Sequence, residues 1–161
     1  MPKVERFEDL KCWQAARRLV QEVYALCGEE PLSRDYRLRD QLTSASVSVM
    51  TNIAEGFARY HRGDFIRFLD IAQSSAVEVK SLLYVVLDQE YASTERIEQL
   101  QERADTTKAI TLGLLRYVNQ SRKGQMDGTH EPTPSYGDGK SVPDVESRTL
   151  PNRFLATSSS S

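Results

Sequence analysis

The chain has few of the residues that build disulfide frameworks, metal centres and membrane spans. Its 161 residues include two cysteines, two histidines and one tryptophan. Cys12 and Cys27 lie in one predicted helix, about 22 Å apart along its axis, which is too far for a disulfide. No apolar run approaches the roughly 20 residues of a membrane-spanning helix, and the N-terminus has no secretory pattern. We therefore expect a cytoplasmic protein without a membrane segment, with two reduced thiols and with Cys27 on the core side.

Patterns of catalysis and cofactor binding are also missing from the sequence. No His or Lys stands at a spacing that would activate one of the serines, and there is no phosphate-binding glycine loop or zinc-ligand spacing. His61 and His130 lie outside the Glu-x-x-His pairs of di-iron bundles. We expect no catalytic residue, no metal and no cofactor, so the chain is predicted not to be an enzyme.

The composition changes near residue 123, and no sign of charge is in excess along the chain. In total, 21 Lys and Arg stand against 23 Asp and Glu, which argues against a protein that coats nucleic acid through its net charge. Of the 39 residues from 123 to 161, 15 are Ser, Gly or Pro, and such a segment buries too little apolar surface to offset its chain entropy. We expect one folded domain over residues 1–122 and a disordered tail over 123–161. A small apolar island in the tail is either incidental or a docking segment: Leu150, Phe154 and Leu155.

Apolar side chains recur at three-four spacing in four segments, which is typical of amphipathic helices. The expected helices run from Glu8 or Asp9 to Cys27, from an N-cap at Ser33 to Phe57 or Ala58, from about Phe65 to Val86, and from Thr94 to Arg122. Short connections between long helices favour antiparallel neighbours. The predicted fold is therefore all-α, an antiparallel up-down-up-down four-helix bundle.

The third helix carries two adjacent apolar seams. The first seam is Phe65, Phe68, Ala72, Ser75, Val79, Leu82 and Val86, and the second is Leu69, Ala76 and Leu83. Together they make a face too wide for a single partner helix, which suits the interior of a bundle. We also expect the helices to carry more apolar surface than one protomer can cover, so that copies associate.

The segment that closes the second helix holds polar residues close to its buried stripe. Asn52 and Glu55 lie three residues apart and share a helix face, and buried polar groups need partners. One interpretation is a functional polar site. The favoured one is structural, with Glu55 capping or tying a neighbouring helix and Asn52 bonding the backbone. Glu78 is expected to face the same region.

Several motifs resemble a bacterial family of four-helix bundle proteins, many of them encoded by intervening sequences within 23S ribosomal RNA genes. The family is also similar to the accessory variability determinant proteins of diversity-generating retroelements. The motifs are the start Phe7-x-x-Leu10-x-x-Trp13, the run Leu38-x-x-Gln41-Leu42, the element Asn52-Ile53-Ala54-Glu55-Gly56-x-x-Arg59, and Phe65-x-x-Phe68-Leu69-x-Ile71-Ala72 with Ser75 and Glu78. This chain has Thr43 and Ser44 where the family often has arginines, Ser74 where it often has glycine, and a tail without counterpart.

The resemblance implies a fold and a quaternary state rather than a reaction. It implies a ring-like homopentamer, and its retroelement branch implies association with a reverse transcriptase and with RNA or DNA. The residues Asn52, Ile53, Ala54, Glu55, Gly56 and Glu78 form the family motif, which is expected to be structural.

Arginines beside an aromatic ring give the best candidates for binding nucleic acid, because guanidinium groups contact phosphate and the ring stacks on bases. The first set is Arg59, Tyr60, Arg62 and Arg67, the second is Arg34 and Arg37 with Arg39, and a third is Arg17 and Arg18. The competing interpretation is a solvated rim in which these arginines pair with Asp35, Asp40, Asp64 and Asp70.

Two functions therefore remain open. The first is a non-enzymatic homo-oligomer that binds RNA or DNA as an accessory or scaffold. The second is a protein-interaction module that docks a partner such as a reverse transcriptase without touching nucleic acid.

Overall fold

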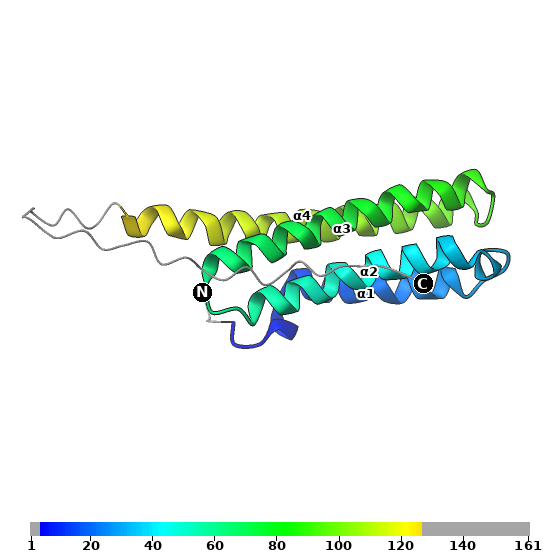
Figure 1. Ribbon diagram of the computed structural model, residues 1–161. Helices are drawn as coiled ribbons and strands as arrows, with labels where there is room; N and C mark the ends of the chain where they lie inside the picture. The colour runs from blue at the N-terminus through cyan, green and yellow to red at the C-terminus, as the bar shows by residue number, and fades with distance from the viewer. Residues whose placement is uncertain (1–3, 127–161) are drawn as a thin grey trace, which may run out of the picture. The chain divides into compact units, whose positions relative to one another are not determined.

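The structure, a computed structural model, describes residues 4–126 and is helical with short connections (Figure 1). Within these residues it contains four α-helices, two short 3-10 turns and no strand, so the all-α prediction of four helices is confirmed. The elements are η1 (Phe7–Asp9), α1 (Lys11–Cys27), η2 (Leu32–Arg34), α2 (Tyr36–Phe57), α3 (Arg62–Asp88) and α4 (Thr94–Met126). None of the described helices is long and apolar enough to cross a membrane.

The core consists of two clusters that show how the helices pack. One cluster joins the second half of α1 and α3 with the first half of α2 and α4, through Leu19, Val23, Leu26, Leu38, Leu42, Val79, Leu83, Ile97 and Leu100. The other joins the opposite halves, through Cys12, Ala16, Val49, Ile53, Leu69 and Ala72 with Ile110 and Leu114. Each helix therefore runs against the direction of the next, and α1 also contacts α4. We call the end with residues 58–61 the corner end, and the end with residues 28–35 and 89–93 the loop end.

Helix boundaries differ from those expected in all four helices. Helix α3 runs from Arg62 to Asp88 instead of from about Phe65 to Val86. Helix α1 begins at Lys11, because Phe7–Asp9 form a separate 3-10 turn and Leu10 is extended. The N-cap of α2 is Asp35 instead of Ser33, since η2 occupies the preceding residues, and the Asp35 carboxylate accepts a hydrogen bond from the Leu38 N–H at 3.1 Å. Helix α4 continues to Met126, beyond the expected end at Arg122. The predicted tail beyond residue 126, with its apolar island, lies outside the described residues.

Both apolar seams of α3 are used inside one protomer. Leu69, Ala76 and Leu83 of the second seam are at most 1% exposed, as are Val79 and Val86 of the first. Phe65, Phe68 and Leu82 of the first seam are half-buried, so the four-helix core covers most of the two seams but not all of them. The exposed apolar side chains of α3 lie elsewhere on the helix, at Ile71, Val77, Tyr84 and Val85.

Both cysteines are free thiols buried in the core, as expected for Cys27. Burial raises the pKa of Cys12 from 9.0 to about 11 and that of Cys27 likewise to about 11. A thiol held neutral in this way is a weak nucleophile.

Candidate nucleic-acid interface

Asn52 starts a chain of hydrogen bonds that ties α2 to α3. Its Nδ2 donates to the Ser48 carbonyl oxygen at 2.8 Å and to Ser48 Oγ at 3.0 Å. Ser48 Oγ lies 2.9 Å from Ser75 Oγ, and Ser75 donates to the Ile71 carbonyl at 3.0 Å. Because the single hydroxyl proton of Ser75 goes to Ile71, the Ser48 hydroxyl donates to Ser75. Asn52 thus bonds the backbone, as the structural interpretation expected, and reaches the next helix through one serine.

Glu55 and Glu78 do not behave as expected. Glu55 forms an ion pair with Arg59, which lies just beyond the end of α2, so it neither caps nor ties a neighbouring helix. Glu78 lines a surface groove with Asp40, Gln41, Ser44, Ala45 and Ser48. Ser48, which lines this groove, precedes Glu55 by seven residues, about 10 Å along α2. The carboxylate of Glu78 therefore lies beside a different part of α2 from the carboxylate of Glu55. Among the described residues no group of three or more His, Cys, Asp or Glu side chains is placed to hold a metal.

Gly56 lets α3 approach the end of α2 closely. A Cβ built on Gly56 would lie 2.6 Å from the Phe68 Cβ and 3.0 Å from the Phe65 ring. The glycine is therefore required by packing. It sets the position of the corner that follows it.

The corner itself presents one aromatic ring and two arginines without ion-pair partners. The Tyr60 side chain is 97% exposed, and its ring meets only the His61 ring, edge to face at 5.4 Å. Arg62 and Arg67 form no salt bridge within residues 4–126. Of the acidic partners expected for them, neither Asp64 nor Asp70 forms a salt bridge within the described residues, and Asp70 accepts a hydrogen bond from Gln73. The paired-rim interpretation therefore fails for these two arginines.

Arg59 differs from its neighbours because it is already engaged. Besides its ion pair with Glu55, its guanidinium lies 5.0 Å from the centre of the Phe68 ring. Each side chain of the pair is about half exposed, 48% for Arg59 and 52% for Glu55.

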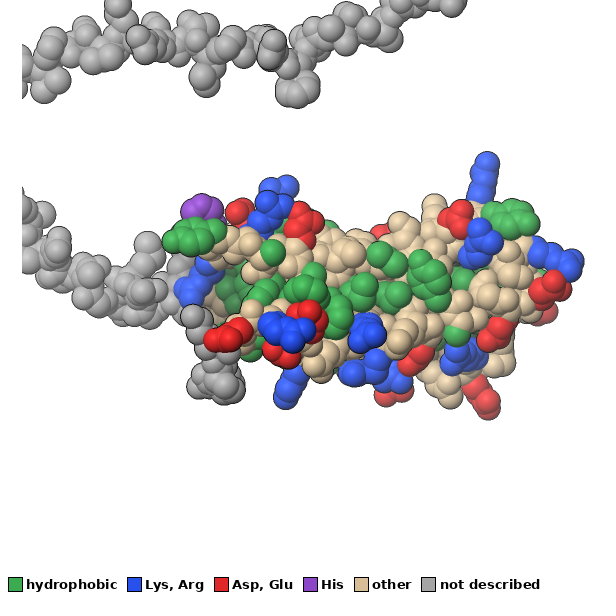
Figure 2. Space-filling model, turned by 90° about the horizontal axis from the view of Figure 1, so that it is seen from below, with side chains coloured by type: hydrophobic (Ala, Val, Ile, Leu, Met, Phe, Trp, Pro, Cys, Tyr) green, Lys and Arg blue, Asp and Glu red, His purple; other side chains and the backbone are tan. Residues whose placement is uncertain are grey.

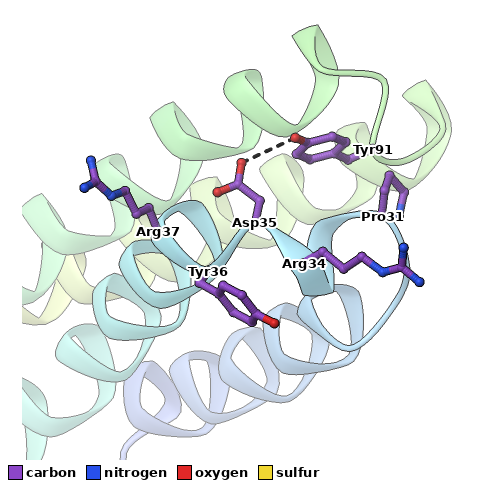
Figure 3. A pocket seen from close by; sticks show the side chains of 6 residues that line it. All are labelled: Pro31, Arg34, Asp35, Tyr36, Arg37 and Tyr91. Atoms are coloured by element: carbon purple, nitrogen blue, oxygen red, sulfur yellow. Dashed lines mark hydrogen bonds between the residues drawn. The ribbon is translucent and has the colours of Figure 1, made fainter.

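The second candidate set lies at the loop end, where most charges are paired. Arg34 contacts Glu30 at 2.8 Å, and the Tyr91 hydroxyl donates to Asp35 at 3.4 Å. Figure 3 shows Asp35 turned toward Tyr91, while Arg34 and Arg37 point away from each other. Arg37 has no salt bridge among the described residues. Arg39 contacts Asp40 at 2.9 Å and stacks over Tyr36 at 4.9 Å.

The six candidate residues therefore do not form one surface. The two sets lie at opposite ends of α2, whose 22 residues extend about 33 Å. The third set is on α1, where the Arg17 guanidinium lies 5.8 Å from the Trp13 ring. Sequence reasoning missed the Ser48–Ser75 contact, because hydroxyl residues at these positions are indistinguishable from other small residues of the two helices.

Comparison with known proteins shows which family this four-helix chain belongs to. A model of the 23S rRNA-intervening sequence protein family matches residues 8–113, which include both sets of arginines. The chain belongs to this family. The resemblance recognised in the motifs is thereby confirmed, and the family covers the bundle from η1 to the second half of α4.

A solved structure supports the same fold. It is a protein of unknown function from the S23 ribosomal protein family of Bacteroides thetaiotaomicron, 20% identical to this chain, with a TM-score of 0.60. The similarity covers 65% of this chain and 95% of that one. At this identity the likeness shows the fold alone. No curated protein matches the chain.

Proposed function

We propose that this protein is a non-enzymatic, homo-oligomeric, cytoplasmic accessory or scaffold that binds nucleic acid, of the kind shared by intervening-sequence and retroelement-accessory proteins. A homopentamer is the proposed assembly, and a reverse transcriptase is a proposed partner. The observation that carries the nucleic-acid part is the corner end, where Tyr60 is exposed and Arg62 and Arg67, in the first two turns of α3, have no ion-pair partner among residues 4–126.

Free arginines favour phosphate as a ligand. A guanidinium that has no carboxylate partner loses no existing ion pair when it binds phosphate, whereas Arg34 and Arg59 would have to leave Glu30 and Glu55. The protein as a whole carries a net charge of −2, so binding by one protomer is expected to be weak. Repetition of the corner around an oligomer would strengthen it, because linked weak sites act together.

An apolar band on the outer surface supports association with another copy or with a partner protein. Figure 2 shows hydrophobic side chains gathered along the middle of one face, between charged side chains. The half-buried apolar side chains of α1 and α2 are Trp13, Val20, Val47, Met50, Ala54 and Phe57, and of these Trp13, Met50 and Phe57 also pack against the core. Exposed apolar surface of this kind is often an interface.

The test of nucleic-acid binding is a mobility-shift titration at several salt concentrations with wild type and with Arg59, Arg62 and Arg67 changed to Ala. Wild type is expected to bind with an affinity that falls as salt rises, and the triple variant is expected to lose most of that dependence. If wild type shows no salt-sensitive binding to RNA or DNA, the nucleic-acid part is wrong. Light scattering tests the assembly, with an expected mass near five times 18.3 kDa.

The second candidate function is a protein-interaction module, favoured by the same apolar band. Removal of residues 123–161 distinguishes a partner bound through the tail from nucleic-acid binding by the bundle. A partner held through the tail would be lost from the truncated chain, whereas nucleic-acid binding by the bundle would persist.

A further inference from the structure

Tyr60 is exposed to a degree that folding does not explain. Its side chain is 97% exposed, whereas the other exposed tyrosines of the described helices, Tyr24, Tyr36, Tyr84 and Tyr117, lie between 51% and 64%. An aromatic ring contributes to stability when it is buried, and this ring buries almost nothing. It stands in the connection 58–61, outside both flanking helices.

Two arginines follow Tyr60 along the chain. Arg62 begins α3, and Arg67 follows five residues later, about 7.5 Å along the helix axis. Neither has an ion-pair partner in the described part of the chain, while Arg59 is held by Glu55. The corner therefore offers one uncovered aromatic face and two unoccupied guanidinium groups on a short, well-defined segment.

We infer that the corner recognises unpaired nucleotides, with a base stacked on the Tyr60 ring and the adjoining phosphates held by Arg62 and Arg67. This inference rests on the proposed function and names its substrate class, which is single-stranded RNA or DNA, or the unpaired loop of a folded RNA. In a duplex each base is already stacked between its neighbours, so the ring has no free face to meet. Phosphate contacts alone do not favour the single strand, because the duplex has the higher density of backbone charge.

The experiment measures the binding of labelled oligonucleotides by fluorescence anisotropy at fixed salt. The probes are a mixed-sequence 20-mer RNA, the same strand annealed to its complement, and a hairpin with a ten-nucleotide loop. The full-length chain is compared with Tyr60→Ala, Tyr60→Phe and Tyr84→Ala. Tyr84 is an exposed tyrosine in the last two turns of α3 and serves as the matched control.

Wild type is expected to bind the single strand and the hairpin loop at least about tenfold more tightly than the duplex. Tyr60→Ala is expected to lose about tenfold on the single strand, the usual contribution of one stacked base, and less than about twofold on the duplex. Tyr60→Phe keeps the ring and is expected to keep the affinity, and Tyr84→Ala is expected to bind as wild type does. Because Tyr60 packs against no core residue, its variants are expected to unfold at the wild-type temperature.

The other outcomes contradict either the stacking inference alone or the proposed function with it. Equal binding of single strand and duplex, with no effect of Tyr60→Ala, would overturn the stacking inference and leave the proposed function standing. Binding that is lost to the same degree on both probes in Tyr60→Ala would also contradict stacking. Absence of binding to every probe would overturn both statements together.

Discussion

The two ends of the bundle carry similar residues and use them differently. At the loop end, Arg34 is paired with Glu30 and Arg39 with Asp40, and Asp35 caps α2 while it accepts from Tyr91. At the corner end, Arg62 and Arg67 have no such partners within residues 4–126, and His61, the N-cap residue of α3, forms no side-chain capping hydrogen bond. Within the described residues, most arginines of the loop end are paired, with Arg37 as the exception, whereas at the corner end Arg59 is paired and Arg62 and Arg67 are not.

The spacing of acidic and basic residues along the chain explains why Arg34 and Arg59 are paired. Arg34 and Arg59 each have a glutamate four residues earlier, at Glu30 and Glu55, and both form the ion pair that this spacing favours. Arg62 and Arg67 have Ala58 and Gly63 at that position. This spacing therefore accounts for two of the paired arginines, whereas Arg39 pairs with Asp40, its neighbour in sequence.

The largest expected effect compares the two ends directly in nucleic-acid binding. Changing both Arg62 and Arg67 to Ala should weaken binding at low salt roughly 30-fold, because each charged contact contributes on the order of 1 kcal/mol. The matched double change of Arg34 and Arg37 should weaken it less than about threefold. Titrations of both variants at three salt concentrations measure this. Equal losses at the two ends would show that the corner has no special role.

The next effect concerns packing at the corner. Gly56→Ala should destabilise the fold by about 2 kcal/mol, because the added methyl overlaps Phe68 and over-packing typically costs this much. Gly113→Ala is the matched control, since nothing lies within 4 Å of a Cβ there, and alanine should raise stability by up to about 1 kcal/mol. Urea unfolding followed by circular dichroism gives both values. A neutral Gly56→Ala would mean that α3 can shift without loss.

Much of the fold could be read from the sequence because three-four spacing over long segments has one structural solution. The four helices and the burial of most of both α3 seams follow from it. The start of α2 was missed because Ser33 and Asp35 are both good N-caps, and the choice depends on whether the intervening residues form a 3-10 turn. Sequence spacing alone does not settle that.

The candidate site was harder to predict, because it depends on contacts between helices. Asn52 was correctly expected to bond the backbone, but its link to Ser75 needs the close approach of α2 and α3. The expectation that Glu55 contacts a neighbouring helix is wrong, because Glu55 pairs with Arg59, four residues later and just past the end of α2.

The caps at the two ends give a smaller effect on stability. Asp35→Ala should cost about 1 kcal/mol, the usual loss for an N-cap, since the Leu38 N–H loses its acceptor. His61→Ser should add about 0.5 kcal/mol at the corner end, because it supplies α3 with a cap that it lacks. Thermal unfolding measures both. Should the serine variant be less stable than wild type, His61 must have a structural role of its own.

The smallest effect at neutral pH concerns the two buried thiols. Because one thiol lies at each end of the bundle, their alkylation rates measure the opening of the two ends separately. Cys12 lies in the corner-end core and Cys27 in the loop-end core. Burial raises the pKa of each from 9.0 to about 11, so at pH 8 the thiolate fraction is about a hundredfold smaller than in the unfolded chain. The folded state holds the proton more tightly, so the stability that depends on it is complete below pH 9 and is lost as the pH rises toward 11.

Alkylation followed by mass spectrometry should find both sites slow at pH 8, with Asp35→Ala accelerating Cys27 and Gly56→Ala accelerating Cys12. Equal acceleration of both thiols in each variant would show that the two ends open as one unit.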